Sequence, residues 1–574
     1  MLSALPKKKI KVRLNGQTYP AVSGETILDV ATRNNIFIPT LCFHPDLDVK
    51  ANCRICAVEI KGQKKLSTAC STEVFDGLEA LTDSRRVRSA RHLNLELLFA
   101  EHETKCPTCT LRYNCALLDL AKKYKIRAKR FKGRKQERQT YKFANAVEID
   151  GSQCIDCRNC VEVCSQVQHI NYLEVSGKGA KQEIVPTKDK DIDCIYCGQC
   201  TLHCPVAAAQ EQDNWLEVEK ALQAKDKIVV AQFAPSVRVA IGEEFGLLYG
   251  SESTGRTVAA LKKLGFAYVF DVNFGADVTT MVEAQELLER LADKKAVKPL
   301  ITSCCPAWVK YAEFFAPELL PNLTSARSPQ IHIGGIIKTY WASQMKLDPK
   351  KIVVVSVMPC TAKKFEAKRS ELKIGRLAPV DLVITTREFA YLLKKNKIDF
   401  ASLKTEDSDK IFNEGSGAAV IYGSSGGVME SALRTAYALA CRDDKAKLCS
   451  NRIDFKEVRG LEDFKEAIID IAGRKLRVGV VNGIGVFDKI KKNLKNYDYI
   501  EVMACPGGCI GGGGQPLPTT KEIRRARVAA LYKIDKFKKI RKAHDNQEVI
   551  KALDWLAQKG LSEEVLHTHY RKRH

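Results

Sequence analysis

Five cysteines in the second half of the chain have the spacing expected of a metal centre. They lie in three short segments, and they are Cys304, Cys305, Cys360, Cys505 and Cys509. Each segment follows a short apolar run that predicts a buried strand, at residues 299–301, 352–355 and 499–502. In an open parallel sheet, the loops at the carboxyl ends of the strands meet in one crevice. Four thiolates suffice for a metal cluster, so the fifth cysteine predicts chemistry beyond structural metal binding.

Alternating strands and helices surround these segments. Further apolar runs predict strands at residues 228–233, 268–272, 381–384, 418–421 and 476–481. Helical stretches lie between them, which indicates an α/β domain with mainly parallel sheets from about residue 227 onward.

A pair of cysteine runs before this domain is the most specific local pattern. Both runs have the spacing C-x2-C-x2-C-x3-C, which is typical of bacterial two-cluster ferredoxins. In those proteins the fourth cysteine of each run binds the cluster of the other run. One 4Fe–4S cluster is then expected at Cys154, Cys157, Cys160 and Cys204. The other is expected at Cys194, Cys197, Cys200 and Cys164.

Two further patterns precede this repeat. The first follows predicted strands at residues 9–14 and 18–22 and a helix at about 26–34, and it consists of Cys42, Cys53, Cys56 and Cys70. Its first gap is longer than in plant-type 2Fe–2S proteins. The second consists of His102, Cys106, Cys109 and Cys115. Taken alone, the first pattern also fits a zinc site, and a lone histidine is more often a surface or core residue.

The order of these motifs resembles that of FeFe hydrogenases over nearly the whole chain, in particular the monomeric clostridial-type enzymes with extra iron–sulfur domains. The resemblance implies an oxidoreductase that interconverts hydrogen with protons and electrons. The implied cofactor is the H-cluster, a 4Fe–4S cluster linked through one thiolate to a two-iron unit with CO, cyanide and azadithiolate ligands. The resemblance also implies a 2Fe–2S cluster at the first front pattern and a third accessory 4Fe–4S cluster, with His102 as a ligand, at the second.

In the catalytic domain, the resemblance assigns Cys305, Cys360, Cys505 and Cys509 to the 4Fe–4S part of the H-cluster, with Cys509 as the bridging thiolate. Lys363 is expected to pair with a cyanide ligand, because a buried cation needs an anion. The other residues expected around the two-iron unit are Pro235, Ser236, Gln330, Met358, Gly423 and Met503. For the two methionines, plain core packing is the alternative.

Cys304 is the cysteine left over. The resemblance makes it the proton donor to the azadithiolate amine, and a thiol with a reference pKa of roughly 8.5 suits that role. A helix predicted at 279–291 places Glu283, Glu286 and Arg290 on one face. With Thr324 they match the proton relay of the family. Without that match, a solvated helix face is the simpler interpretation of the two glutamates.

Five regions follow from these motifs. They are a 2Fe–2S ferredoxin-like domain at 1–85, a one-histidine, three-cysteine 4Fe–4S domain at 86–150, a two-cluster ferredoxin domain at 151–215, the H-cluster domain at 216–516 and a helical segment at 517–574. The last segment resembles a small subunit that is a separate chain in some relatives. The predicted fold class is therefore multidomain, with α+β ferredoxin-like domains before a large α/β catalytic domain.

Three positions depart from the family pattern. Ala307 replaces a glycine common after Cys-Cys-Pro, Ala362 occupies a position often held by serine, and Gly511 replaces a frequent asparagine. None of them is a ligand. We expect Ala307 to restrict the loop that carries Cys304. Cys441 and Cys449 match no motif and are assigned no role.

Composition limits the partners. The chain has 574 residues, 22 cysteines and a formal net charge of +24. Its basic residues are mostly dispersed, with clusters at 125–135 and 570–574, and no nucleic-acid-binding motif accompanies them. A solvated basic surface is one interpretation of this charge. The functional interpretation is a docking face for ferredoxin or a similar acidic, low-potential electron carrier. No signal peptide or membrane-spanning run is visible, so the cysteines indicate a cytoplasmic metalloprotein. A monomer and hydrogenase maturation proteins as partners follow from the resemblance.

Four other interpretations share part of the pattern. An electron-transfer subunit like the large subunit of complex I lacks the three cysteine segments. A hydrogenase-like iron–sulfur assembly protein is expected to lack the proton-donor cysteine and the two-iron unit, so Cys304 and Lys363 together count against it. A hydrogen sensor usually carries a signalling domain. The catalytic subunit of an NADH- or ferredoxin-linked complex usually carries a further C-terminal cluster domain, although partner subunits on separate chains remain open.

Overall fold

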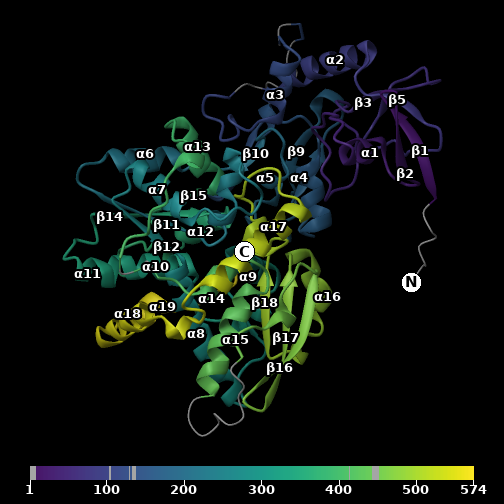
Figure 1. Cartoon of the computed structure of the whole chain (residues 1–574). Coiled ribbons are helices and arrows are strands. Elements are labelled where there is room, and N and C mark those ends of the chain that lie inside the picture. The colour runs from purple at the N-terminus through teal and green to yellow at the C-terminus, as the bar shows by residue number, and fades with distance from the viewer. Residues whose placement is uncertain are drawn as a thin grey trace.

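The computed structural model of the chain describes residues 8–102, 105–127, 130–131, 138–410, 412, 414–441 and 452–573. Part of the predicted basic segment 125–135, Cys449 and His574 lie outside them. In Figure 1 the N-terminal domains, in purple and blue, occupy one end of the molecule, and the teal and green catalytic domain with the yellow C-terminal segment forms the rest. In the described part, no helix is long and apolar enough to cross a membrane.

The first domain is a five-stranded sheet with one short helix. β1 (Lys9–Leu14) alternates exposed and buried residues, as expected of a strand with one face on a core. α1 (Ile27–Arg33) begins after Thr26, which forms a capping box with Asp29. These elements confirm the strands and the helix predicted here. The other strands are β2 (Gln17–Val22), β3 (Ala57–Ile60), β4 (Ser67–Thr68) and β5 (Glu79–Leu81).

Two helices lead into the two-cluster domain, which has a three-stranded sheet and a separate two-stranded ladder. Its short helices α4 and α5 occupy equivalent places in the cysteine repeat. Each begins after a residue in the left-handed conformation, Arg158 at φ 63° and Gly198 at φ 69°. The elements are α2 (Arg85–Glu101), α3 (Ala116–Lys123), β6 (Thr140–Phe143), β7 (Val147–Asp150), α4 (Asn159–Glu162), β8 (Leu173–Ser176), β9 (Glu183–Pro186), α5 (Gln199–Leu202) and β10 (Ala209–Glu211).

The catalytic domain contains two four-stranded sheets. The first has the order β12-β11-β14-β15 and is entirely parallel. The second has the order β13-β18-β17-β16 and is parallel except for β16. Their strands are β11 (Ile228–Phe233), β12 (Tyr268–Asp271), β13 (Leu300–Ile301), β14 (Ile352–Met358), β15 (Leu382–Thr385), β16 (Phe464–Ile471), β17 (Arg474–Asn482) and β18 (Tyr499–Met503). Mainly parallel sheets in an α/β domain confirm the predicted fold class.

Helices flank both sheets. The longest, α8 (Asn273–Ala292), begins just after β12 and packs against α10 and α15. The others are α6 (Trp215–Gln223), α7 (Thr254–Leu264), α9 (Pro306–Phe315), α10 (Pro329–Ile336), α11 (Ala342–Gln344), α12 (Ala362–Ala367), α13 (Thr386–Lys395), α14 (Gly417–Val420), α15 (Gly427–Ala440) and α16 (Phe487–Lys491).

Two sequence predictions were wrong in detail. The run at 418–421 is not a strand but lies mainly in α14, which Ser416 caps by accepting a hydrogen bond from the backbone N–H of Ala419. A buried apolar run of four residues has no periodicity to separate strand from helix. The single open sheet is also replaced by two sheets, because β13 and β18 pair with each other and not with β14.

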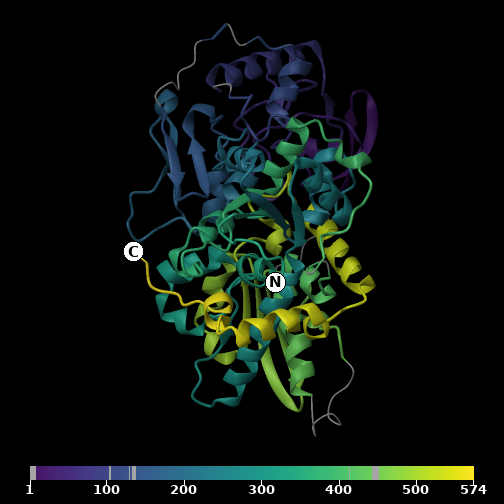
Figure 2. The same cartoon turned by 90° about the vertical axis from the view of Figure 1, so that its left-hand side faces the viewer.

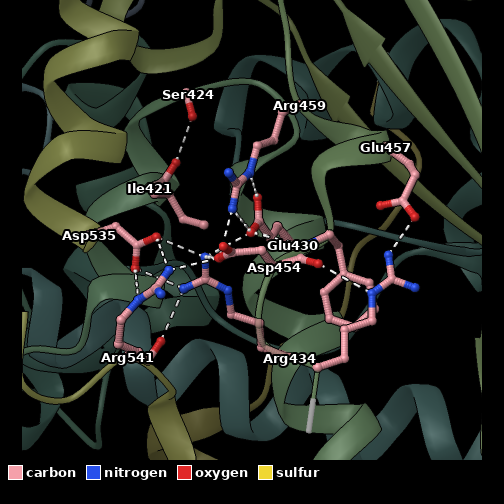
Figure 3. Close-up of polar contacts among 11 residues, drawn as sticks. Ile421, Ser424, Glu430, Arg434, Asp454, Glu457, Arg459, Asp535 and Arg541 are labelled. Atoms are coloured by element: carbon pink, nitrogen blue, oxygen red, sulfur yellow. Dashed lines mark hydrogen bonds and ion pairs between the residues drawn. The ribbon is translucent and has the colours of Figure 1, made fainter. Parts of the chain in front are cut away.

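The C-terminal segment lies across the catalytic domain as three helices (Figure 2), which are α17 (Lys521–Phe537), α18 (Gln547–Gln558) and α19 (Ser562–Leu566). A buried ion network joins α17 to α15 (Figure 3). The Arg434 guanidinium lies 2.7 Å from Glu430 and 2.8 Å from Asp535, and Arg541 lies 2.7 Å from Asp535. The opposite charges in this buried network compensate one another. The network therefore attaches the C-terminal segment to α15.

Candidate functional site

One cavity brings the three cysteine segments together. It lies at the carboxyl ends of β13, β14 and β18. Every residue that the sequence predicts for the H-cluster pocket lines it, as does Cys304. These residues are Cys304, Cys305, Cys360, Cys505, Cys509, Pro235, Ser236, Gln330, Met358, Lys363, Gly423 and Met503.

Each cysteine reaches the cavity because a strand ends just before it. β13 ends at Ile301, three residues before Cys304, and Pro306 then starts α9. Cys360 follows β14, and Cys505 follows β18. The cavity therefore lies between the ends of two sheets, and it is not the switch point of a single sheet.

The thiols of the cavity are buried, and burial sets their protonation. Burial raises the pKa of Cys509 to about 12 and that of Cys505 well above its usual value, so without a cation these thiols stay neutral. A bound metal deprotonates its thiol ligands outright. The cavity thiols therefore suit a bound metal group that replaces their protons.

Polar atoms that line the cavity have unused hydrogen-bonding capacity. Lys363 Nζ donates to the Cys304 backbone oxygen (3.0 Å) and to Glu366 (2.8 Å), and an ammonium group has a third donor. Ser236 Oγ and Gln330 Oε1 are buried and have no partner in the described part of the chain. Buried polar atoms normally find a partner. These atoms therefore fit a polar group bound in the cavity, such as the cyanide and dithiolate ligands of a two-iron unit.

A buried carboxyl lies behind Cys304. Glu283 is fully buried on α8, and burial raises its pKa to about 8. Burial and the Glu283 charge together raise the pKa of Cys304 well above that of a free thiol. Glu283 Oε1 accepts a hydrogen bond from Tyr499, whereas Oε2 has no partner among the described side chains.

The outer end of the predicted relay is a hydrogen-bonded group around Glu286. Thr324 Oγ1 donates to Glu286 Oε2 at 2.6 Å, and Arg290 donates to Oε1 at 2.7 Å. Ser325 also donates to Oε2, from its backbone N–H at 3.0 Å. Its hydroxyl lies 2.9 Å from Nδ1 of His567 in the C-terminal segment. Among these described residues, no direct hydrogen bond joins Glu283 to Cys304 or to Thr324.

The ferredoxin repeat forms two separate pockets. One is lined by Cys154, Cys157, Cys160 and Cys204, and the other by Cys164, Cys194, Cys197 and Cys200. Each pocket thus takes three cysteines from one run and the fourth from the other, as the spacing predicts. The partition follows from the equivalent placement of α4 and α5 in the two halves of the repeat.

The front patterns are also brought together. Cys56 and Cys70 have their sulfurs 3.4 Å apart, and the backbone N–H of Cys53 lies 3.5 Å from Cys42 Sγ. His102 is buried, and its Nδ1 lies 2.8 Å from the Gln153 backbone oxygen. With the proton on Nδ1, Nε2 is free for a metal, which is the usual arrangement of a ligating histidine.

The two-cluster domain touches the catalytic cavity through backbone. Cys505 Sγ lies 3.9 Å from the backbone oxygen of Cys197. A Cβ atom on Gly513 would lie 2.5 Å from that same oxygen, so only glycine allows this approach. Arg387 holds the contact, because it donates to the Gly513 backbone oxygen (2.7 Å) and lies 2.6 Å from Glu211 of β10.

Four residues that support the site belong to no motif and are not predicted by the sequence: Glu366, Arg387, Glu211 and Tyr499. Only Glu366 had a local signal, because it follows Lys363 by three residues on one helix. The other three contact residues that are far away in the sequence, so spacing along the chain gives no indication of them.

The structure shows where the three residues that depart from the family pattern lie. Ala307 lies in the first turn of α9, so the expectation that it restricts a loop is corrected: it favours a helix. Ala362 is the buried first residue of α12. A Cβ on Gly511 would collide with the Pro506 backbone oxygen, so this chain accommodates only glycine there without a shift.

Comparison with known proteins agrees with this geometry. The family "iron only hydrogenase large subunit, C-terminal domain" matches residues 227–513. Further matches are a 2Fe–2S iron–sulfur cluster binding domain at 7–85, the NADH-ubiquinone oxidoreductase-G iron–sulfur binding region at 91–130, a 4Fe–4S dicluster domain at 153–208 and the iron hydrogenase small subunit at 521–573.

Relatives match over nearly the full length. The NADP-reducing hydrogenase subunit HndD of Solidesulfovibrio fructosivorans is 40% identical over 98% of this chain and 99% of its own. Iron hydrogenase 1 of Clostridium pasteurianum is 41% identical over 97% of this chain and 99% of its own. A structure of apo FeFe hydrogenase HydA1 from Chlamydomonas reinhardtii is 35% identical, covers 62% of this chain and 98% of its own, and superposes with a TM-score of 0.54.

Proposed function

The chain belongs to the iron-only hydrogenase family, and we propose specific roles for its cavity residues in the reversible reaction 2H⁺ + 2e⁻ = H₂ that it catalyses. The observation that carries the proposal is the cavity itself. Five cysteines, Lys363 and two unpartnered polar atoms face one another there. A structural metal site needs neither a fifth thiol nor an ammonium group.

The H-cluster, when bound, supplies the iron chemistry that forms and splits the H–H bond. Cys305, Cys360, Cys505 and Cys509 would hold its 4Fe–4S part, with Cys509 as the proposed bridging thiolate. Lys363, Ser236 and Gln330 would contact the polar ligands of the two-iron unit, and Pro235, Met358, Gly423 and Met503 would shape its pocket. Hydrogenase maturation proteins are the proposed source of the two-iron unit.

Protons pass from Glu286 and Thr324 to Glu283 and then to Cys304, which exchanges them with the bound cofactor. A pKa of about 8 makes Glu283 able to both take and release a proton near neutral pH. Arg290, which the family's relay also includes, does not carry protons itself. A guanidinium does not deprotonate in proteins, so Arg290 orients Glu286.

Electrons reach the cavity through one 2Fe–2S and three accessory 4Fe–4S clusters, whose proposed ligands are the four cysteine patterns of the front domains. The cluster proposed at Cys197 is the last one before the cavity in this electron-transfer route, because the Cys197 backbone contacts Cys505. We propose reduced ferredoxin as the donor, since a protein with net charge +24 attracts an acidic carrier. A monomer in the cytoplasm, divided into the five predicted regions, completes the proposal.

A second candidate is the catalytic subunit of a nicotinamide-linked hydrogenase complex. The full-length match to an NADP-reducing hydrogenase subunit favours it. In that case NADPH or NADH would deliver electrons through partner subunits, because this chain shows no nucleotide-binding motif of its own.

The test is to reconstitute anaerobically purified protein with a synthetic two-iron azadithiolate complex and to compare electron donors. The proposal predicts hydrogen evolution from reduced ferredoxin alone. Evolution from reduced methyl viologen but not from ferredoxin would favour the complex subunit. No evolution from either donor, with all accessory clusters present by iron analysis, would overturn the enzymatic proposal for this cavity.

A further inference from the structure

One buried tyrosine contacts the proton route from outside the predicted motifs. Tyr499 is the first residue of β18, where it pairs with Leu300 of β13 on one side and Val478 of β17 on the other. Its side chain is fully buried in an apolar cluster. A buried phenol needs a hydrogen-bond partner, and the partner here is Glu283 Oε1, in a short contact.

The two oxygens of Glu283 are therefore unequal. Oε1 is held by Tyr499, and Oε2 has no partner among the described residues, although it is buried. A carboxyl anchored at one oxygen cannot rotate freely, so a proton that arrives at and leaves Glu283 does so through Oε2. Cys304 lies close enough to have its own pKa raised by the Glu283 charge.

We propose that Tyr499 is a positioning residue of the proton route, which fixes Glu283 and leaves a single oxygen for proton exchange. This inference rests on the proposed function, because it requires Glu283 to carry protons. The phenol also donates to the carboxylate form and thereby stabilises it. Without that donor, Glu283 holds its proton more tightly.

The groups around Glu283 set the direction of the effect. Burial raises its pKa first, the Tyr499 hydrogen bond lowers it, and the charges of Glu286 and Glu501 raise it. Cys304 and Tyr422 are the other titratable groups that face Glu283. Burial raises the pKa values of both, so both are uncharged near neutral pH. Among the described groups around Glu283, Tyr499 is the one that lowers its pKa.

Tyr499→Phe removes only the hydroxyl and keeps the ring in the apolar cluster. The loss of a hydrogen bond to a charged group raises the pKa of Glu283 by about one unit. The limb of the pH–rate profile that reports Glu283 then moves to higher pH by that amount, for hydrogen evolution and hydrogen oxidation alike. The matched control is Tyr497→Phe, because Tyr497 donates a similar 2.8 Å bond to Glu466 on the far side of the sheet.

A second readout does not depend on turnover. In infrared spectra recorded over a pH titration, the C=O band of protonated Glu283, identified by its loss in Glu283→Gln, should move to higher frequency in Tyr499→Phe and persist to higher pH. Incorporation of 3,5-difluorotyrosine at position 499 strengthens the donor and should shift the band and its titration in the opposite direction.

The outcomes distinguish a failure of the Tyr499 proposal from a failure of the proposed function. Lower activity in Tyr499→Phe with an unchanged pH profile and an unchanged carboxyl band would overturn the proposal and leave Tyr499 as a core residue. An inactive parent protein, or a Glu283→Gln variant as active as the parent, would overturn the proposed function instead. If Tyr499→Phe loses iron, the fluorinated protein still decides the matter, because it keeps both ring and hydroxyl.

Discussion

The cavity has an electron side and a proton side, and they are built differently. On the electron side, Cys197 contacts Cys505 through backbone packed against Gly513. On the proton side, Glu283 and Cys304 are buried side chains, and Glu283 Oε2 has no partner among the described residues, whereas its Oε1 is held by Tyr499. An electron needs only a short, rigid gap, whereas a proton needs a series of groups that can bind and release it. Damage to the two sides should therefore look different.

The largest expected effect is on the proton side. Glu283→Gln should lower hydrogen evolution by about 10²–10⁴-fold, the usual contribution of a positioned acid–base group. Glu289→Gln is the matched control, because Glu289 is exposed on the same helix. Hydrogen evolution driven by reduced viologen measures the activity, and cluster spectra should show full iron content in both variants. Equal activity of the two variants would contradict the role of Glu283 in proton transfer.

The same variant has a stability signature. The pKa of Glu283 is raised from 4.5 to about 8 in the folded protein, so folding binds a proton between these values. The parent therefore loses stability as the pH rises through this window, whereas Glu283→Gln does not. Thermal unfolding at several pH values should show the variant gaining on the parent toward alkaline pH. Parallel curves would contradict the assigned pKa.

Lys363 should be the next most sensitive position, because it faces the cavity and also pairs with Glu366. Lys363→Met leaves the buried Glu366 carboxylate uncompensated, at a cost of about 3–5 kcal/mol of unfolding free energy. Addition of Glu366→Gln should restore stability but not retention of the two-iron unit. Denaturant unfolding and infrared bands of the bound CO and cyanide measure the two separately. Full recovery of both would make Lys363 a purely structural residue.

On the electron side, Gly513→Ala forces a Cβ against the Cys197 backbone, and such overpacking costs about 1–3 kcal/mol. The two-cluster domain should move away from Cys505, so the accessory clusters stay reduced for longer during turnover. Freeze-quench EPR would follow them. The pH profile should not change, and a shifted profile would show that the two sides are coupled.

The smallest effect is expected at Ala307. Ala307→Gly weakens the first turn of α9 by about 1 kcal/mol. Because this turn follows Cys305 directly, oxygen inactivation of the loaded enzyme is the sensitive readout. An unchanged inactivation rate and unchanged melting temperature would show that this departure from the family pattern has no consequence.

The sequence predicts the parts of the site that depend on local spacing, and it does not predict contacts between distant segments of the chain. Ligand sets depend on local spacing, so the motifs predicted the two pockets of the ferredoxin repeat, and strand-then-cysteine order predicted one cavity. Tyr499 and Arg387 could not be predicted, because their partners are more than 170 positions away along the chain and on other elements. The helix at 417–420 was mistaken for a strand because its cap, Ser416, lies outside the apolar run.

The most direct test of the central claim is hydrogen evolution by reconstituted Cys304→Ala beside the parent protein. Reduced methyl viologen supplies the electrons, and infrared spectra verify equal loading of the two-iron unit. The proposed roles predict that evolution falls by at least about 10²-fold while every cluster remains in place. Evolution at the parent rate would contradict the assignment of the fifth cysteine as the proton donor and, with it, the proton side of the cavity.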